Sequence, residues 1–400
     1  MNLKLSTRLD GVAESATLKM NAAARELSAK GVKVYNLTAG EPDFPVLAPV
    51  KEAAIGAITG DFNKYTPVNG TLELRKAISK KFLKDNALEY APEDVIVSAG
   101  AKQDIFNFLL AVVSPGDEVI IPGPYWVSYP DMVKLAGGVP VTIDAPASHG
   151  YKITPEQLKG ALTKRTRAVI LNSPSNPTGG VYSRAEQAQL AKVLEGTDAW
   201  VVSDEIYEKL VYDGEFASFA SLSSDAFART LTVNGFSKTY SMTGWRLGYA
   251  AGPKKLIAAM ALLQGQSTSG ASSIAQKAAL AALELPDGAF RPMVEAFRKR
   301  RDRMAEIFSQ GGGNFSFVRP AGAFYFFLNV ERAYGKSYNH DQLIAGSDDM
   351  AFYLLNTAHV GTVAGKGFGA DDCLRLSFAV SDAEVEEGSK RIVEAVEKLK

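Results

Sequence analysis

The stretch DVIVSAGAKQDIFNFLLAVV, residues 94–113, combines a short apolar strand, a turn of small residues and an amphipathic helix. Its Val/Ile run has no polar alternation, which is typical of a strand covered on both faces. The residues that follow place one apolar face on a helix, formed by Ile105, Phe106, Leu109, Leu110 and Val113. A strand that leads directly into a helix is the unit from which parallel sheets are built.

The same alternation continues to about residue 290. Further β-rich runs occupy residues 117–124, 138–145, 167–174, 199–205, 229–235 and 246–252. We therefore predict an α/β fold in which a mostly parallel sheet, with helices on both faces, forms a large domain over residues 48–290. Beyond it, strands and helices come in blocks, which predicts a smaller α+β domain over residues 291–400. We expect the N-terminal segment, residues 1–47, to join this smaller domain.

Charge and composition exclude several classes of function. Lys+Arg and Asp+Glu are both 44, so no net field attracts nucleic acid or an anionic membrane. The basic run RKRRDR at 298–303 is interrupted by Asp302, which predicts the solvated face of a helix. No segment reaches the roughly 20 apolar residues of a membrane span, and the first 30 residues lack a signal-peptide core. We expect a cytoplasmic enzyme with no nucleic-acid or membrane partner.

Cysteine and histidine are scarce. The single cysteine, Cys373, excludes an intrachain disulfide, and the three histidines show no metal-like spacing. We therefore expect no metal site and a buried, structural thiol at Cys373.

Polar and aromatic residues follow five of the predicted strands. In a parallel sheet, ligands bind beyond the carboxyl ends of the strands, so these side chains could converge on one ligand. They are Gly100, Ala101 and Lys102 after the first strand, Trp126 after the second, Asn176 after another, then Asp204 and Tyr207, and finally Ser237, Lys238 and Arg246.

Each of these groups has a structural and a chemical interpretation. The turn before Ala101 is either a plain strand-to-helix connection or a phosphate seat, because a helix N-terminus presents free N–H groups that Ser237 and Arg246 could supplement. Asp204 is either a helix N-cap or the partner of a cationic ring nitrogen. Lys238 is either a surface lysine or an amine whose pKa is lowered beside Arg246, able to attack a carbonyl.

Two further side chains complete the set. Trp126 either packs in the core or stacks on a flat ring, and Asn176 either shapes a turn before Pro177 or donates to a phenolic oxygen. A ring stacker, a ring-nitrogen partner, a phenolate donor, a phosphate seat and an amine are together what pyridoxal 5′-phosphate requires.

At this point the sequence resembles the fold-type I, class I/II aminotransferases, and most closely their prokaryotic aspartate-type members. The resemblance runs nearly end to end. Its most specific motifs are TAGEPDF (38–44), KYTPVNGTLELR (64–75), SAGAKQ (98–103), PYWVSYP (124–130), NSPSNPTGG (172–180), VSDEIYE (202–208), NGFSKTYSMTGWRLGY (234–249) and RLS (375–377).

The resemblance implies roles for individual residues. Lys238 would form the Schiff base and then act as the base of a ping-pong amino transfer. Asp204 would pair with the pyridine nitrogen, and Tyr207 and Asn176 with the phenolic oxygen, while Trp126 covers the ring. The phosphate would be held by Gly100, Ala101, Lys102, Ser237 and Arg246, together with Tyr65 from the partner subunit of a homodimer with shared active sites.

Substrate residues are implied in the same way. Gly40, Trp126, Asn176 and Arg375 would bind the amino or 2-oxo acid, with Arg375 on its α-carboxylate. Lys102 and Thr17 would bind a distal carboxylate; the alternative interpretation of Lys102 is an ordinary exposed residue of the helix. L-Aspartate with 2-oxoglutarate is the favoured pair. The sequence departs from the family pattern at Ala364, where proline is common, and in the long stretch 334–349.

Other functions stay open at this stage. Aromatic amino acids or prephenate could be substrates, and a C–S β-lyase would share the cofactor residues. A ligand sensor of the same fold would need a DNA-binding head, for which the chain leaves no room before residue 38. A nicotinamide dehydrogenase would need a GxGxxG turn after its first strand, which GAKQD does not supply.

Overall fold

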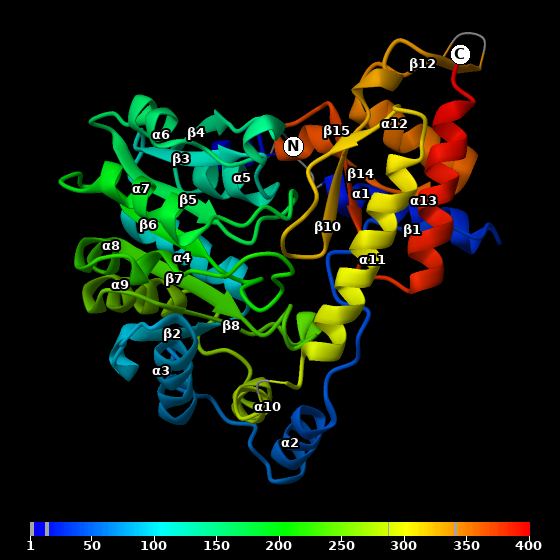
Figure 1. The fold of residues 1–400 in the computed structure, drawn as a ribbon. Coiled ribbons are helices and arrows are strands. Elements are labelled where there is room, and N and C mark those ends of the chain that lie inside the picture. The colour runs from blue at the N-terminus through cyan, green and yellow to red at the C-terminus, as the bar shows by residue number, and fades with distance from the viewer. Residues whose placement is uncertain (1–3, 13–15, 287, 340–341) are drawn as a thin grey trace.

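The structure is a computed structural model that describes residues 4–12, 16–286, 288–339 and 342–400. A seven-stranded sheet with the order β2-β8-β7-β6-β5-β3-β4 forms the centre of its larger part (Figure 1). The strands are β2 (Val95–Ser98), β3 (Glu118–Gly123), β4 (Val139–Asp144), β5 (Thr166–Asn172), β6 (Trp200–Asp204), β7 (Thr230–Gly235) and β8 (Gly248–Ala251).

The directions of the strands place most of their carboxyl ends at one edge of the sheet. Only β8 runs antiparallel to its neighbours β2 and β7, and every other pair in the sheet is parallel. The carboxyl ends of β2, β3, β5, β6 and β7 therefore lie along the same edge. The predicted α/β fold with a mostly parallel sheet is confirmed.

Helices cover both faces of this sheet because its strands are apolar on both sides. Ile96, Ile170 and Val202 pack in one core cluster with α4, while their neighbours Val97, Val169 and Val201 pack in clusters on the opposite face. The helices of this part are α2 (Ala48–Thr59), α3 (Leu72–Asn86), α4 (Ala101–Val112), α5 (Ser128–Leu135), α6 (Pro155–Ala161), α7 (Arg184–Leu194), α8 (Ser224–Arg229), α9 (Lys254–Gly265) and α10 (Ser273–Leu283).

The smaller part contains the chain's other sheets. An antiparallel sheet has the order β14-β15-β10-β9, and β1 pairs in parallel with β13. Its strands are β1 (Tyr35–Asn36), β9 (Ser316–Phe317), β10 (Tyr325–Asn329), β11 (Ser337–Asn339), β12 (Gln342–Leu343), β13 (Val360–Gly361), β14 (Val363–Ala364) and β15 (Cys373–Ser377). Its helices are α1 (Ala16–Ala29), α11 (Arg291–Ser309), α12 (Ser347–Tyr353) and α13 (Asp382–Glu397).

The N-terminal segment reaches this part through β1. Figure 1 shows α1, α11 and α13 grouped beside the smaller sheet, away from the large one. Pairing between β1 and β13 is the arrangement expected if residues 1–47 join the C-terminal unit. The division at residues 47/48 and 290/291 stays a prediction.

The basic run on α11 differs from expectation. Arg300 is 9% exposed and Arg301 is 1% exposed, so this run is not a fully solvated face. Arg300 lies between Asp43 and Asp382, at 2.9 and 2.6 Å, and Arg301 binds Asp213. The prediction was wrong for these two side chains because acidic partners from distant segments, invisible in the local sequence, neutralise their buried charge.

Two expectations concern what the chain lacks. Of the helices in the described ranges, none combines the length and the apolar character needed to cross a membrane. No group of three or more potential metal ligands occurs within the described part of the chain either. Cys373 is buried and its Sγ lies 3.7 Å from the Tyr151 hydroxyl.

Candidate active site

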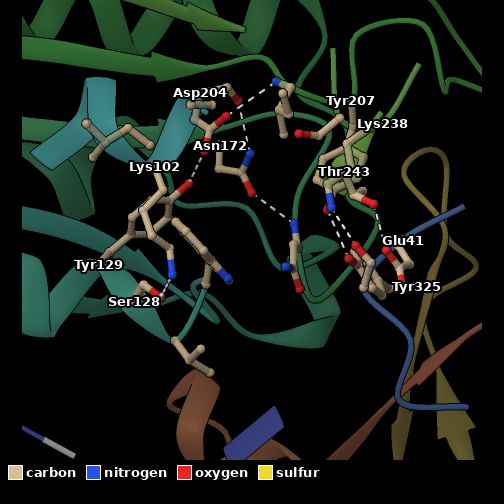
Figure 2. A pocket seen from close by; sticks show the side chains of 18 of the residues that line it. Glu41, Lys102, Ser128, Tyr129, Asn172, Asp204, Tyr207, Lys238, Thr243 and Tyr325 are labelled. Atoms are coloured by element: carbon tan, nitrogen blue, oxygen red, sulfur yellow. Dashed lines mark hydrogen bonds between the residues drawn. The ribbon is translucent and has the colours of Figure 1, made fainter. Parts of the chain in front are cut away.

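A cavity of about 430 Å³ opens at the edge where the strand ends gather. Figure 2 shows Lys102, Ser128 and Tyr129 on one side of it and Lys238, Thr243 and Glu41 on the other. The residues that line it are Gly40, Glu41, Ala101, Lys102, Ile105, Trp126, Val127, Ser128, Tyr129, Asn172, Asn176, Asp204, Ile206, Tyr207, Ser237, Lys238, Thr243, Arg246, Tyr325 and Arg375.

Asp204, the last residue of β6, is buried at the floor of this cavity. Tyr129 donates to its Oδ2 at 2.6 Å and the Ile206 N–H donates to its Oδ1 at 3.3 Å. The carboxyl therefore accepts a hydrogen bond from the backbone of the following turn and also lines the cavity, while its pairing with a cationic ring nitrogen stays a prediction. No cation of the described residues forms a salt bridge with it, and burial raises the pKa of Asp204.

Lys238 follows β7 and points at the N-terminal segment. Its Nζ donates to the Gly40 carbonyl and lies 5.8 Å from the centre of the Tyr207 ring. Burial, and then the nearby Arg375, lower the pKa of Lys238 to about 8. Roughly a tenth of the amine is thus in its neutral, nucleophilic form at pH 7 and about half at pH 8, far more than for a solvated lysine.

The start of α4 offers unused backbone donors. Gly100 is its N-cap with φ +102°, and a Cβ there would lie 2.6 Å from Arg246 Nη2. Among the described residues, no acceptor is found for the N–H groups of Ala101 and Lys102. Arg246 donates to the Thr243 carbonyl at 2.8 Å. Ser237 lines the same corner of the cavity.

Arg375 enters the cavity from β15 of the smaller sheet. Its Nη1 donates to Asn176 Oδ1 at 3.2 Å and its Nη2 to the Thr38 carbonyl at 2.9 Å. Its Nε has no partner in the described structure, although the side chain is buried. Burial lowers the pKa of Arg375. Because the Arg375 guanidinium is buried and binds no carboxylate of the described residues, it is suited to binding an anionic ligand.

Aromatic side chains frame the remaining walls. The Tyr207 hydroxyl lies 2.9 Å from the Tyr325 hydroxyl, and Trp126 stands edge-on to Tyr129 with ring centroids 5.3 Å apart. Lys102 places its Nζ 4.7 Å from the Trp126 ring centre and 3.2 Å from Ser128 Oγ. Burial and Arg246 lower the pKa of Lys102.

The described lining of the cavity does not include every predicted site residue. Tyr65 is fully exposed and does not line it. Thr17 belongs to α1, and its side chain lies outside the described part of the structure. Gly100 shapes the rim without lining it, and the other predicted site residues all line the cavity.

Several lining residues were missed by sequence reasoning. Tyr129 contacts Asp204, and Asn172 donates from Nδ2 to the Asp204 carbonyl at 2.9 Å. Glu41 accepts a hydrogen bond from Thr243 Oγ1 at 2.6 Å. Tyr129 stands one helical turn from Trp126, and Asn172 ends a predicted strand, so spacing alone could have found these two.

The comparisons with known proteins agree with this geometry. The family model described as aminotransferase class I and II matches residues 32–392. The aspartate/prephenate aminotransferase of Nitrosomonas europaea is 45% identical, over 98% of this chain and 99% of its own length. The aspartate aminotransferase of Geobacillus stearothermophilus is 46% identical, over 98% of both chains.

Solved structures give the same result. The crystal structure of the aspartate aminotransferase from Rhizobium meliloti has a TM-score of 0.96 and 43% identity, and covers 100% of both chains. That of the Thermus thermophilus aspartate aminotransferase with maleate has a TM-score of 0.92 and 42% identity, over 98% of this chain and 100% of its own.

Fold and site therefore define a pyridoxal 5′-phosphate-dependent transferase of fold type I. More particularly, the chain belongs to the class I and II aminotransferase family. It is an enzyme that moves amino groups, and the predictions of fold class, reaction class and cofactor are confirmed.

The residues present fit that cofactor. Asp204 is a buried carboxyl without a cationic partner among the described residues, as a protonated ring nitrogen requires. The unused N–H groups at the start of α4 suit a phosphate dianion, and the amine of Lys238 suits the aldehyde.

Proposed function

We propose that the enzyme transfers the amino group of L-aspartate to 2-oxoglutarate. The observation that carries this proposal is Arg375, buried with an unpartnered Nε in the same cavity as Lys238. Every amino acid and 2-oxo acid has the α-carboxylate that such a guanidinium binds through two hydrogen bonds. The relatives named aspartate aminotransferase support the choice of donor.

Each residue would then do a defined part of the work. Bound pyridoxal 5′-phosphate supplies an aldehyde that takes up the amino group and a ring that withdraws electrons from the substrate Cα. Lys238 would hold the cofactor through its aldehyde, and its amine, when free, would be the base that moves the proton of the substrate Cα. Asp204, whose Oδ2 accepts a hydrogen bond from Tyr129, would keep the ring nitrogen protonated.

Other side chains hold the reactants in place. Trp126 would cover one face of the ring, and Tyr207 and Asn176 would bind its phenolic oxygen. Asn176 Nδ2 is available for this role because it donates to none of the described residues, while its Oδ1 accepts from Arg375. Ser237 and Arg246 supplement the backbone N–H groups that bind the phosphate.

The distal carboxylate needs a second cation. Lys102 lines the cavity beside Trp126 and meets this need, with Thr17 as its proposed helper. The similar Thermus thermophilus enzyme was solved with maleate, a dicarboxylate with as many carbon atoms as aspartate. Prephenate is a second candidate acceptor, which relatives named aspartate/prephenate aminotransferase favour.

We also propose that two copies form a homodimer with shared active sites. Tyr65 is fully exposed in the segment between α2 and α3, so its hydroxyl is free to reach the phosphate in a partner's cavity. Two exposed side chains of α2, Ile55 and Ile58, support an interface on this side. A cytoplasmic location stays a prediction.

The test replaces the amine. Lys238→Ala is expected to abolish the covalent cofactor absorption and to lower transamination by at least about 10³-fold, because base and attachment are lost together. Lys255→Ala, which changes an exposed lysine on α9, is the matched control and retains both. Normal turnover in Lys238→Ala would refute the assignment.

Donor and acceptor screening tests the substrate. Strong activity with aspartate and 2-oxoglutarate supports the proposal, and activity only with aromatic donors refutes it while leaving the cofactor residues in place. Lys102→Ala should lower kcat/KM for aspartate by about 10-fold or more and leave alanine nearly unchanged, because only aspartate has a distal carboxylate.

A further inference from the structure

One buried acid lies beside the phosphate seat and has no part in the mechanism above. Asp104, in the first turn of α4, is 0% exposed. Its Oδ2 lies 2.5 Å from Ser98 Oγ, which in turn lies 3.1 Å from the Gly100 carbonyl oxygen. Its Oδ1 has no partner within the described ranges.

The number of protons available for the hydrogen bonds of Ser98 indicates whether Asp104 is charged. A serine hydroxyl has a single proton, so Ser98 can donate either to the carbonyl of Gly100 or to the carboxyl, and not to both. With an ionised carboxylate, Ser98 would donate to Asp104 and the Gly100 carbonyl would keep only its bond from the Gln103 N–H, while a buried charge would be left with its Oδ1 unpaired. A protonated carboxyl donates to Ser98 Oγ, and Ser98 then donates to Gly100, so the whole chain of bonds is satisfied.

We propose that Asp104 is held as a neutral carboxylic acid and is a positioning residue for the phosphate seat, acting on the Gly100 peptide through Ser98. The proposal rests on the proposed function in one respect, the role of the α4 N-terminus in holding the phosphate.

The Gly100 peptide is fixed from two sides. Its carbonyl also accepts from the Gln103 N–H at 2.9 Å, and Gln103 Oε1 accepts from the Ala99 N–H at 2.7 Å. These bonds hold the carbonyl inside the turn, so the N–H groups of Ala101 and Lys102 stay unpaired for an anion. Without the Asp104–Ser98 link, one side of this arrangement is lost.

Surrounding charges favour the neutral form. Burial raises the pKa of Asp104 well above its usual range; the hydrogen bond with Ser98 opposes this shift and the nearby Asp204 adds to it. The field of the α4 N-terminus favours an anion, but a bound phosphate dianion would occupy that field and repel a second negative charge. Desolvation therefore decides the balance, and the acid keeps its proton.

Binding of pyridoxal 5′-phosphate and of pyridoxal to cofactor-free protein tests the positioning role of Asp104. Asp104→Asn keeps the shape and an N–H donor to Ser98, so affinity for pyridoxal 5′-phosphate should stay within about 3-fold of the wild type. Asp104→Ala should weaken that affinity by about 5- to 10-fold, the value of one hydrogen bond. Pyridoxal, which lacks the phosphate, should bind both variants within about 2-fold of the wild type.

Two outcomes of this measurement overturn the proposal. If Asp104→Asn binds pyridoxal 5′-phosphate as weakly as Asp104→Ala, a neutral donor is not what the site uses. If pyridoxal loses as much affinity as pyridoxal 5′-phosphate, the effect is a general disturbance of the fold. Ser98→Ala should match Asp104→Ala, and the double variant should be no weaker, because the two residues form one chain of bonds.

Infrared spectroscopy gives a readout that needs neither cofactor nor activity. The difference spectrum between cofactor-free wild type and Asp104→Asn at pH 7 should contain the C=O stretch of a protonated carboxyl. A carboxylate band in its place overturns the proposal, even if Asp104→Ala fails to fold. Failure of the wild type to bind pyridoxal 5′-phosphate would instead refute the proposed function and leave the infrared result intact.

Discussion

The chemistry of single residues in this enzyme follows from burial. Lys238 is an amine in a cavity that also holds Arg375 and Arg246, and both the burial and these charges favour its neutral form. Asp204 is a carboxyl in the same cavity, yet burial opposes its charge as well. One ligand could therefore bind both groups, with its aldehyde at the amine of Lys238 and its cationic ring nitrogen at the carboxyl of Asp204.

This environment predicts the pH dependence of cofactor loading. Since the pKa of Lys238 is lowered to about 8, its neutral fraction should rise between pH 7 and 9, below the range where a solvated lysine loses its proton. The rate at which cofactor-free enzyme incorporates pyridoxal 5′-phosphate should therefore rise with a midpoint near pH 8, measured by stopped-flow absorbance. A midpoint near pH 10 would contradict the prediction.

Arg375 predicts a loss shared by all donors. Arg375→Lys keeps the charge but loses the planar, two-pronged fork, so kcat/KM should fall by about 10- to 100-fold. The decrease should be similar for aspartate and alanine, because both have the same α-carboxylate. Steady-state kinetics with the two donors check this, and a loss confined to aspartate would assign Arg375 to the distal carboxylate instead.

Among the residues of the cavity, those at or just after the carboxyl ends of strands were predicted from the sequence. Lys238, Asp204 and Asn176 were found because parallel strands place their carboxyl ends at one edge. Glu41 and Tyr325 were not found, since they reach the cavity from the N-terminal segment and the smaller sheet, whose contacts with the large sheet leave no local pattern.

Among the elements, the contact between β8 and α4 is unusually close. A Cβ on Gly248 would lie 2.2 Å from the Ala101 nitrogen and 2.5 Å from the Gly100 carbonyl carbon. Such a contact with backbone atoms requires the start of α4 to move. The position of the phosphate seat therefore depends on the absence of a side chain in a neighbouring strand.

Gly248→Ala should consequently weaken cofactor binding. We expect the affinity for pyridoxal 5′-phosphate to fall by about 10-fold or more, and the free energy of unfolding to fall by about 1–3 kcal/mol from overpacking. Gly160→Ala is the control, because that helical glycine of α6 has no atom near its Cβ position. Fluorescence titration and urea unfolding measure the two effects. Unchanged cofactor affinity in Gly248→Ala would show that the seat tolerates the shift.

A second element-scale contact links α3 to the turn after β6. Glu205, 1% exposed, accepts hydrogen bonds from Ser203 and Ser218 at 2.8 and 2.7 Å, while Glu208 binds Lys81 of α3. Burial raises the pKa of Glu205 to about 8. Between its unfolded pKa of about 4.5 and 8, the folded state binds more protons than the unfolded state.

The free energy of unfolding should therefore fall as pH rises through this window. Glu205 alone contributes a slope of roughly 1.4 kcal/mol per pH unit, and Glu205→Gln removes it. Urea unfolding of cofactor-free protein at pH 5.5 and 7.5 measures the difference, which should be smaller in the variant. Equal pH dependence in both proteins would show that Glu205 is ionised when folded.

The sequence predicted which segments form strands and helices better than it predicted how these elements pair and what they contact. The Val/Ile runs of 94–100 and 167–174 became β2 and β5 because strands buried on both faces need no polar alternation. The antiparallel direction of β8 and the buried arginines of α11 were not predicted. Both depend on partners far along the chain, such as β2 for β8 and Asp43 for Arg300.

For the whole molecule, the proposed dimer has a direct test. The chain has a mass of 42.8 kDa, and sedimentation should give about twice this value. Tyr65→Phe and Lys238→Ala should each be poorly active alone. Mixed and refolded together, they should recover activity, because one site of the hybrid contains both native residues. A monomer, or no recovery on mixing, would contradict shared sites.

Sequence predicted the architecture of the whole molecule, since alternating strands and helices have few topological solutions. It did not predict how the two sheets meet, which depends on side chains such as Arg375 that cross from the smaller sheet to Asn176.

The pairing of β1 with β13 also bears on synthesis. Gly40 and Glu41 lie a few residues after β1 and contact Lys238 and Thr243, yet β13, the strand that pairs with β1, comes after every strand of the large sheet in the chain. A growing polypeptide can complete the seven-stranded sheet early, with its reactive amine uncovered. The wall of the cavity formed by Gly40 and Glu41 is therefore fixed only after β13, which follows the whole seven-stranded sheet along the chain, has been made.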